Sequence, residues 1–406
     1  MTGPGAGDAA RAAERVARES YGRLVALLAW QWRDLAAAED ALSDAFAAAL
    51  RTWPAQGVPG SPEAWLMAAA KRRLLHQARH TRLTQDPAVT VLLDSEGGDE
   101  AGAATEAVPD ARLRLMFVCA HPALAENVRA PLMLQAVLGL DAQAIASAFL
   151  VSPAAMAQRL VRAKARIRET GLRFETPEAR ELPERLAAVL EAVYAGYTLG
   201  RQGPDTPAGD LREEALFLAR LAARLLPEQA EAQGLLALLL HAEARRAAQF
   251  DAAGRFVPLP AQDPAAWDAA LIDAAEAALW AAARLRQPGP FQIEAAIHSA
   301  HAQRRATGQT PWRAIAQLYG VLVQHHPSLG GRTGHAVALA EAGDPAAALA
   351  VLDRLSLDAV AAYAPYWVAR AHVLRLAGAP GRGEALQRAM GLTDDPRLRE
   401  FLASQS

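Results

Sequence analysis

The sequence predicts an all-α protein built from several helical domains. Alanine, leucine and arginine, which are good helix formers, dominate the chain, and the short alternating runs typical of strands are few. Apolar residues instead recur at spacings of three or four, the period of a helix with one buried face. The 406 residues are enough for two or three domains, and with 52% hydrophobic residues each can bury a core.

Composition limits the partners and the setting of the protein. The net charge is −2, so a surface that binds nucleic acid must be local. Cys119 stands alone, which excludes an intramolecular disulfide and a multi-cysteine metal site. No apolar run has the length of a membrane span, and the N-terminus lacks the apolar core of a signal peptide. We therefore expect a cytoplasmic protein with no membrane contact.

The N-terminal part predicts a disordered tail to about Asp8, then helices over 9–32 and 35–53. The second helix has an apolar stripe expected to be buried, made of Leu42, Ala45, Phe46, Ala49, Leu50 and Trp53. Its opposite side carries three acids, Glu39, Asp40 and Asp44. Taken alone, these acids indicate only a solvated polar face.

A third helix begins after Ser61 and becomes basic toward its end, with no acid after Glu63. Its cations include Lys71, Arg72, Arg73 and Arg79. Phosphate binding is one use of such a run. The alternative is a solvated helix end whose cations interact favourably with the helix dipole.

Residues 83–110 carry seven acids, several glycines and no basic residue, so we expect a flexible acidic linker.

The stretch 141–168 predicts a helix-turn-helix, to which 111–139 supplies supporting helices. Asp141 can cap the first helix, Ser152 and Pro153 begin the second, and Gly171 supplies a left-handed stop. The second helix has an apolar face of Met156, Leu160, Ala163 and Ile167. Its other faces carry Arg159, Arg162, Lys164, Arg166 and Arg168 with no acid among them. This pattern is typical of a helix that enters a DNA groove, although an arginine-rich surface helix is the alternative.

These motifs resemble bacterial sigma factors of the extracytoplasmic-function type. The segment SPAAMAQRLVRAKARIR is similar to the recognition helix of region 4, and AAEDALSDAFAAAL to the part of region 2 that packs on RNA polymerase. CAHPAL resembles a signature of a subgroup with a C-terminal tetratricopeptide-like extension. The resemblance implies four parts: region 2 at 9–82, the linker at 83–110, region 4 at 111–175 and a helical-repeat domain at 176–406.

The resemblance also assigns roles to individual residues. Contacts with core RNA polymerase are implied for Glu39, Asp40 and Asp44. Contacts with the minus-ten promoter element are implied for Lys71, Arg72, Arg73 and Arg79. Contacts with the minus-thirty-five element are implied for Ser152, Gln158, Arg159, Arg162, Lys164 and Arg166. Core RNA polymerase and promoter DNA are therefore the expected partners.

The C-terminal half has a short internal repeat. ALAEAGDPAAALAVLDRL and VLRLAGAPGRGEALQRAM align, which places Gly343 and Gly378 about one tetratricopeptide period apart. Such repeats stack helix pairs and often bind a protein or peptide in a concave groove. The less favoured alternative is a stabilising appendage.

The chain lacks the motifs of the common enzyme classes. It contains no G-x-S-x-G, H-E-x-x-H or Walker A sequence, and SLGGRTGH has no phosphate-binding lysine in frame. We expect no catalytic residue, cofactor or metal. The sequence thus predicts a sigma factor modulated by its repeats. The alternatives are a helix-turn-helix regulator that senses a ligand, and an RNA-binding repeat adaptor, which the mixed charge of the repeats disfavours.

Overall fold

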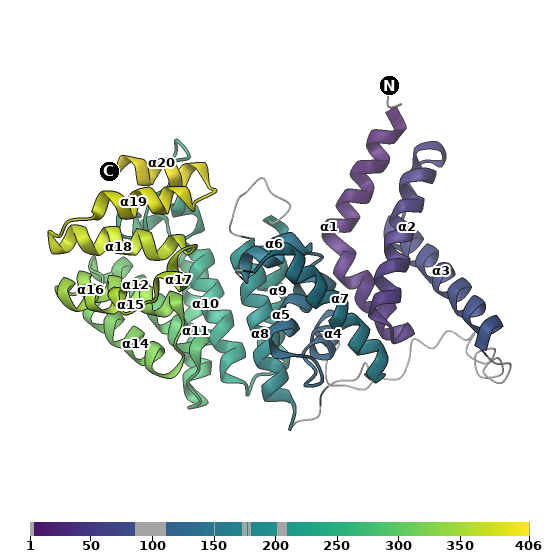
Figure 1. Cartoon of the computed structure of the whole chain (residues 1–406), viewed down its shortest axis with the longest axis horizontal. Coiled ribbons are helices and arrows are strands. Elements are labelled where there is room, and N and C mark those ends of the chain that lie inside the picture. Colours follow the sequence, from purple (N-terminus) through teal and green to yellow (C-terminus); the bar gives the residue numbers. More distant parts are fainter. Residues whose placement is uncertain are drawn as a thin grey trace. The chain divides into compact units, whose positions relative to one another are not determined.

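The structure is a computed structural model that describes residues 4–85, 111–149, 151–172, 177, 180–200 and 209–405. Within these ranges the secondary structure is helical (Figure 1), apart from one antiparallel β-bridge between Phe250 and Phe256. The all-α prediction is confirmed. The predicted acidic linker lies outside the described residues, except for 83–85, which belong to the third helix.

Contacts divide the chain into two compact units, Met1–Leu218 and Ala219–Ser406. The first unit contains α1 (Pro4–Trp32), α2 (Leu35–Gln56), α3 (Pro62–Gln85), α4 (Ala111–Cys119), α5 (Glu126–Ala136), α6 (Ala142–Ala148), α7 (Pro153–Thr170), α8 (Leu182–Leu199) and the beginning of α9 (Gly209–Leu225). Because α8 packs on α5, this unit extends beyond the boundary expected near 175.

Helices α1, α2 and α3 pack on one another at the N-terminus. Helix α1 begins at Pro4, so residues 4–8 are helical where the sequence predicted a disordered tail. Asp34 caps α2 by accepting from the backbone N–H of Ala37 at 3.0 Å. The predicted stripe of α2 is buried or half-buried except at Leu50, which is 51% exposed. Leu50 lies to one side of the buried stripe, because Ala49 and Trp53 before and after it are both buried.

Helix α1 also makes close backbone contact with the end of α5. A Cβ at Gly22 would lie 1.7 Å from the backbone oxygen of Val137, so only glycine allows this approach. Two residues later, Gly139 has a φ of +69° and lies against the ring of Tyr21. The N-terminal helices and the helices around α5 are therefore packed directly together.

The second unit is made of antiparallel helix pairs. Its helices are α10 (Ala230–Ala244), α11 (Ala269–Arg284), α12 (Pro290–Ala302), α13 (Arg304–Thr307), α14 (Trp312–His325), α15 (Leu329–Glu341), α16 (Pro345–Asp353), α17 (Leu357–Val360), α18 (Ala364–Ala377), α19 (Arg382–Gly391) and α20 (Pro396–Ser404). The successive pairs are α10/α11, α12/α14, α15/α16 and α18/α19, and each packs on the next. Gly343 and Gly378, predicted at equivalent turns, both have positive φ, at 101° and 61°.

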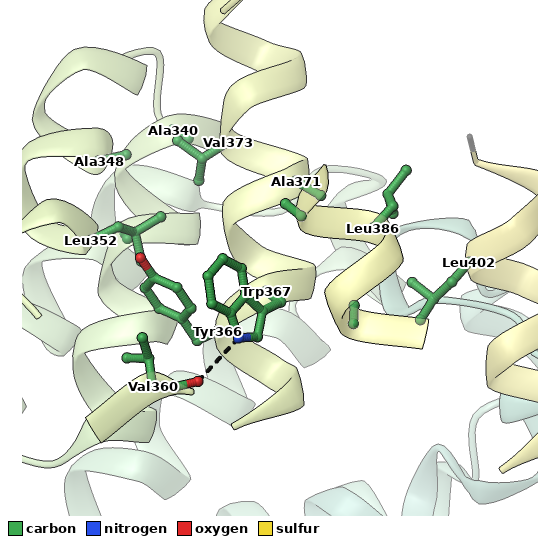
Figure 2. Packing of buried hydrophobic residues seen from close by; sticks show 13 residues of the cluster. Ala340, Ala348, Leu352, Val360, Tyr366, Trp367, Ala371, Val373, Leu386 and Leu402 are labelled. Carbon is green, nitrogen blue, oxygen red and sulfur yellow. Dashed lines mark hydrogen bonds between the residues drawn. The ribbon is translucent and has the colours of Figure 1, made fainter. Parts of the chain in front are cut away.

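The core of the last two pairs combines large aromatic residues with alanines (Figure 2). The indole of Trp367 is buried and donates to the backbone oxygen of Val360 at 3.0 Å. Tyr366 meets Trp367 edge to face, with ring centroids 5.0 Å apart. Alanines such as Ala340 and Ala348 keep neighbouring helices close enough to enclose these rings.

The glycines of SLGGRTGH have a packing role. Ser328 caps α15, accepting from the backbone N–H of Gly331 at 2.9 Å. A Cβ at Gly334 would lie 2.6 Å from the ring of Tyr319 on α14. The segment therefore forms the start of α15, and the lack of a side chain at Gly334 leaves room for the ring of Tyr319.

A segment between α10 and α11 contacts the last helix of the second unit. Phe250 and Phe256 pair through the single β-bridge, and Phe256 meets Phe401 of α20 with ring centroids 5.4 Å apart. The guanidinium of Arg397, also on α20, lies 4.1 Å from the ring centre of Phe250. The beginning and the end of this unit are therefore in contact.

Candidate nucleic-acid interface

Helices α6 and α7 form the predicted helix-turn-helix. The Asp141 carboxylate accepts from the backbone N–H of Ala144 at 2.8 Å, and Ser152 Oγ from that of Ala155 at 3.3 Å. Pro153 occupies the first turn of α7, and Gly171 ends it in the left-handed conformation with φ 57°. The chain turns by 109° between the two helices, within the range of this motif. The predicted caps and stop are confirmed.

Helix α7 buries one face and presents a basic one. Its buried residues are the predicted four, Met156, Leu160, Ala163 and Ile167. Gln158, Arg162 and Arg166 are exposed, and Arg159 is half-buried beside them. The Nε of Arg162 donates to the backbone oxygen of Gln158 at 3.3 Å, which aligns its side chain along the helix. Ser152, the cap, is exposed at the N-terminus of this face.

Helix α3 supplies a second group of cations in the same unit. Arg72 is exposed and its Nε donates to the backbone oxygen of Ala68 at 3.2 Å, while Lys71 is half-buried. Arg73 is 49% exposed and pairs with Asp44 of α2, with Nε 2.8 Å from the carboxylate. The side chain of Arg79 lies outside the described residues.

Comparison with known proteins identifies the helix-turn-helix. Residues 114–167 match the family Sigma-70, region 4. The segment around α6 and α7 is a sigma-70 region 4 domain. Residues 185–283, which begin within α8 and end within α11, match a family of unknown function (DUF6596).

A relative matches nearly the whole chain. An uncharacterized protein of Rhizobium meliloti (strain 1021) is 38% identical over 384 residues, covering 92% of this chain and 90% of that protein. The chain belongs to the same family as this protein. No solved structure matches the chain. The match to region 4 supports a sigma-factor-like DNA-binding role.

The region 4 domain contacts the N-terminal helices through one buried ion pair. Lys164 Nζ of α7 lies 2.5 Å from Glu39 Oε2 of α2, and their side chains are 19% and 10% exposed. The second oxygen of Glu39 is buried and has no hydrogen-bond partner among the described residues. Burial raises the pKa of Glu39 and Asp40 adds to this effect, although Lys164 opposes it. The pair therefore sits where a carboxylate is poorly solvated.

This pair changes two of the sequence-based expectations. Glu39 is not on the exposed acidic face of α2, because α7 covers it. Lys164 is not on the free basic face of α7, because its ammonium group is occupied by Glu39. Asp40 is exposed, and Asp44 is exposed while paired with Arg73. The sequence contained one hint: lysine occurs only at Lys71 and Lys164 in a chain that otherwise uses arginine.

Polar clusters elsewhere have structural partners. Cys119 is buried, and burial, followed by the charge of Glu39, raises the pKa of its thiol. In the second unit, Arg245 contacts His298 Nδ1 at 2.8 Å, and His301 packs edge to face on Trp312. In the part of the chain that the structure describes, no three His, Cys, Asp or Glu side chains gather as metal ligands would.

None of the described helices combines the length and the apolar character needed to cross a membrane. The bent pair α6–α7 reaches the required length and composition, and this pair is the helix-turn-helix itself.

Proposed function

We propose that the protein is a sigma factor of the extracytoplasmic-function type, which binds core RNA polymerase and directs promoter-specific initiation. The observation that carries this proposal is the basic outer face of α7, which has no acid from Pro153 to Arg168, within a region 4 domain. A second basic helix, α3, lies in the same compact unit. A simple helix-turn-helix regulator has no need of that second helix.

In this role α7 reads the minus-thirty-five element. Gln158, Arg159 and Arg162 are placed to reach base edges, because the exposed first half of a recognition helix enters the major groove. Ser152 at the N-terminus and Arg166 on the outer face are suited to phosphates. Lys164 joins them only after it leaves Glu39.

Helix α3 has the corresponding role at the minus-ten element. Lys71, Arg72 and Arg73 provide the phosphate-binding charge, and Arg79 extends it along the sequence. An open hollow beside Arg73, lined by Trp32, Asp34, Leu74, His76 and other residues, gives this part of the unit a concave surface.

Core polymerase binds α2 in this proposal. Asp40 and Asp44 are exposed acids that complement a basic partner surface. Replacing both with alanine should weaken association with core polymerase and leave the circular dichroism spectrum unchanged. Unchanged co-purification with core polymerase would exclude this face as the contact.

The second unit would modulate this activity as a tetratricopeptide-like domain. The support is its stacked helix pairs and the 35-residue interval between Gly343 and Gly378. Its expected partner is a regulatory protein or peptide. The protein itself would not be an enzyme, since polymerase performs the chemistry, and it would act in the cytoplasm.

The decisive experiment is run-off transcription with purified core polymerase on DNA from upstream of the protein's own gene. A specific transcript that depends on the added protein supports the proposal. DNA binding without any transcript, with or without core polymerase, would favour the regulator instead.

A chain ending after Leu226 tests the second unit, because it keeps the pair between Arg112 and Glu214. Unaltered transcription by this shorter chain in cells would leave the second unit without a regulatory role.

A further inference from the structure

The outer face of α11 leaves a large aromatic side chain in solvent. Trp280 is 69% exposed, whereas tryptophan side chains are mostly covered in folded proteins. The inner face of the helix, at Ala275, Ala278 and Ala282, is buried, and α11 packs on α10 and α12. Trp280 therefore contributes little to the core of the second unit. Tryptophan is enriched among the residues that dominate protein–protein binding, so its exposure here indicates a contact surface.

We call the stripe of residues around Trp280 the α11 face. Its members recur every three or four positions, so they share one side of the helix. All but the half-buried Ala281 are exposed, and they are Ala270, Asp273, Ala274, Ala277, Trp280, Ala281 and Arg284. The middle of the α11 face is apolar, and one acid and one base lie toward its two ends. Its alanines allow a second helix to approach closely, because the distance between packed helices depends on the size of the contacting side chains.

The two charges of the α11 face cannot satisfy each other within one chain. Asp273 and Arg284 are eleven positions apart, which is about 16 Å along the helix axis. Neither side chain forms an ion pair with another residue of the described ranges. Two copies of α11 laid antiparallel would instead place the acid of each copy beside the base of the other. The α11 face is therefore complementary in charge to itself.

The same antiparallel register brings the apolar residues together. When Asp273 faces the partner's Arg284, the twofold axis passes between positions 278 and 279. Trp280 then lies only about 2 Å from this axis along the helix, so the two indoles meet at the centre of the interface. On the other edge of the face, Ala274 lies within about 3 Å, measured along the axis, of the level of the partner's Ala281. One patch that meets its own copy in this way is the basis of an isologous dimer.

We propose that the α11 face is a homodimer interface, through which two copies of this chain pair antiparallel about Trp280. The occupant is a second copy because the acid, the base and the indole all find partners in one twofold register. Each tryptophan can bury about 150–250 Å², and one helix pair remains below the roughly 1,200 Å² of a stable interface. The dimer is therefore weak, with a Kd of about 10–100 µM. This pairing requires neither polymerase nor DNA.

The first measurement is analytical ultracentrifugation of the full chain over a hundredfold range of concentration around this Kd. Wild type should change from monomer to dimer as its concentration rises. Trp280→Ala should raise the Kd by about tenfold or more, because it removes the central contact from both copies. Leu357→Ala is the matched control, since Leu357 is also 69% exposed but lies on α17, and it should leave the Kd unchanged.

The second measurement exchanges the charges of the α11 face. Asp273→Arg and Arg284→Asp each place like charges opposite one another in the dimer, so each variant alone should lose most of its self-association. The double variant should recover it, because acid and base have only changed places. An equimolar mixture of the two single variants should form a heterodimer, which also shows that both variants are folded. Asp358→Arg, which changes an exposed acid of α17, is the matched control.

The third measurement is disulfide crosslinking, which reports the direction of the two helices. Positions 277 of the two copies are about 4.5 Å apart along the axis, and positions 270 about 25 Å apart. Ala277→Cys should therefore crosslink under mild oxidation and Ala270→Cys should not, while native Cys119 is buried.

Three results would overturn the inference. The first is a chain that stays monomeric at every concentration, and the second is a dimer that Trp280→Ala and both charge variants leave unchanged. The third is a crosslink at position 270 as efficient as that at position 277, which would exclude the antiparallel register. None of these results bears on the proposed sigma function, which run-off transcription tests separately.

Discussion

Acid should weaken the second unit through His241 of α10. This side chain is 1% exposed, and burial, together with the charge of Arg245, lowers its pKa from 6.5 to about 4. Between about pH 6.5 and pH 4, His241 is therefore neutral in the folded protein but protonated in the unfolded chain. Its contribution to stability is complete above pH 6.5 and is lost as the pH falls toward 4.

The size of this effect follows from the two pKa values. Lowering the pH from 7.5 to 5 should reduce the free energy of unfolding by about 2 kcal/mol for this one group. Glu276, whose carboxylate is 3.4 Å from His241 Nε2, should recover part of the loss by pairing with the protonated ring. His301, whose pKa is also lowered to about 4, acts in the same direction.

The assay is urea unfolding of the full chain, followed by tryptophan fluorescence between pH 7.5 and 5. His241→Leu removes the titrating group. The free energy of unfolding of the second unit should therefore depend less steeply on pH, by the contribution of about one bound proton. The absolute stability of the variant does not matter, because only the slope against pH is compared. Superimposable pH profiles for wild type and variant would refute the reasoning.

Further substitutions test the roles of individual side chains. Ser152→Ala should lower the stability of the helix-turn-helix by about 1 kcal/mol in thermal unfolding, and Ser152→Asp should restore it. Arg162→Ala should reduce the discrimination between bases at one position of the DNA by about 1–3 kcal/mol, whereas Arg166→Ala should lower the affinity for all DNA sequences alike. Equal losses of affinity at every sequence for both variants would contradict this division. Trp367→Phe removes the indole donor from the backbone oxygen of Val360, which keeps the backbone N–H of Tyr363 at 3.0 Å, so the free energy of unfolding should fall by about 0.5–1.5 kcal/mol from the lost hydrogen bond. An unchanged denaturation midpoint would show that the bond contributes nothing.

The helix-turn-helix could be predicted from sequence because its signals are local. Asp141, Ser152 and Gly171 each act on backbone groups within a few residues, so their spacing fixes where α6 and α7 begin and end. The apolar face of α7 follows from helical periodicity in the same way. Both predictions depend on no distant part of the chain.

The charged residues were harder to place, because their partners are remote in sequence. Nothing near Glu39 in the sequence distinguishes it from exposed Asp40, and its burial depends on tertiary packing, which includes its pairing with Lys164 of α7. The role of Gly334 in SLGGRTGH was hard to predict for the same reason, because the ring of Tyr319 that requires a glycine there lies on another helix. Sequence periodicity predicts which face of a helix is apolar, but it does not predict which helix covers a polar one.

The contact between Phe256 and Phe401 affects how the second unit folds. In an open array of helix pairs each pair touches only its neighbours, so terminal pairs can fray independently and folding can start anywhere. Here residues about 145 positions apart meet, and closing so long a loop has an entropic cost that only the complete unit offsets. The last helix, α20, is consequently part of the environment of the first pair. The second unit should therefore unfold as one cooperative block, and its final residues should exchange their amide hydrogens as slowly as α10 does.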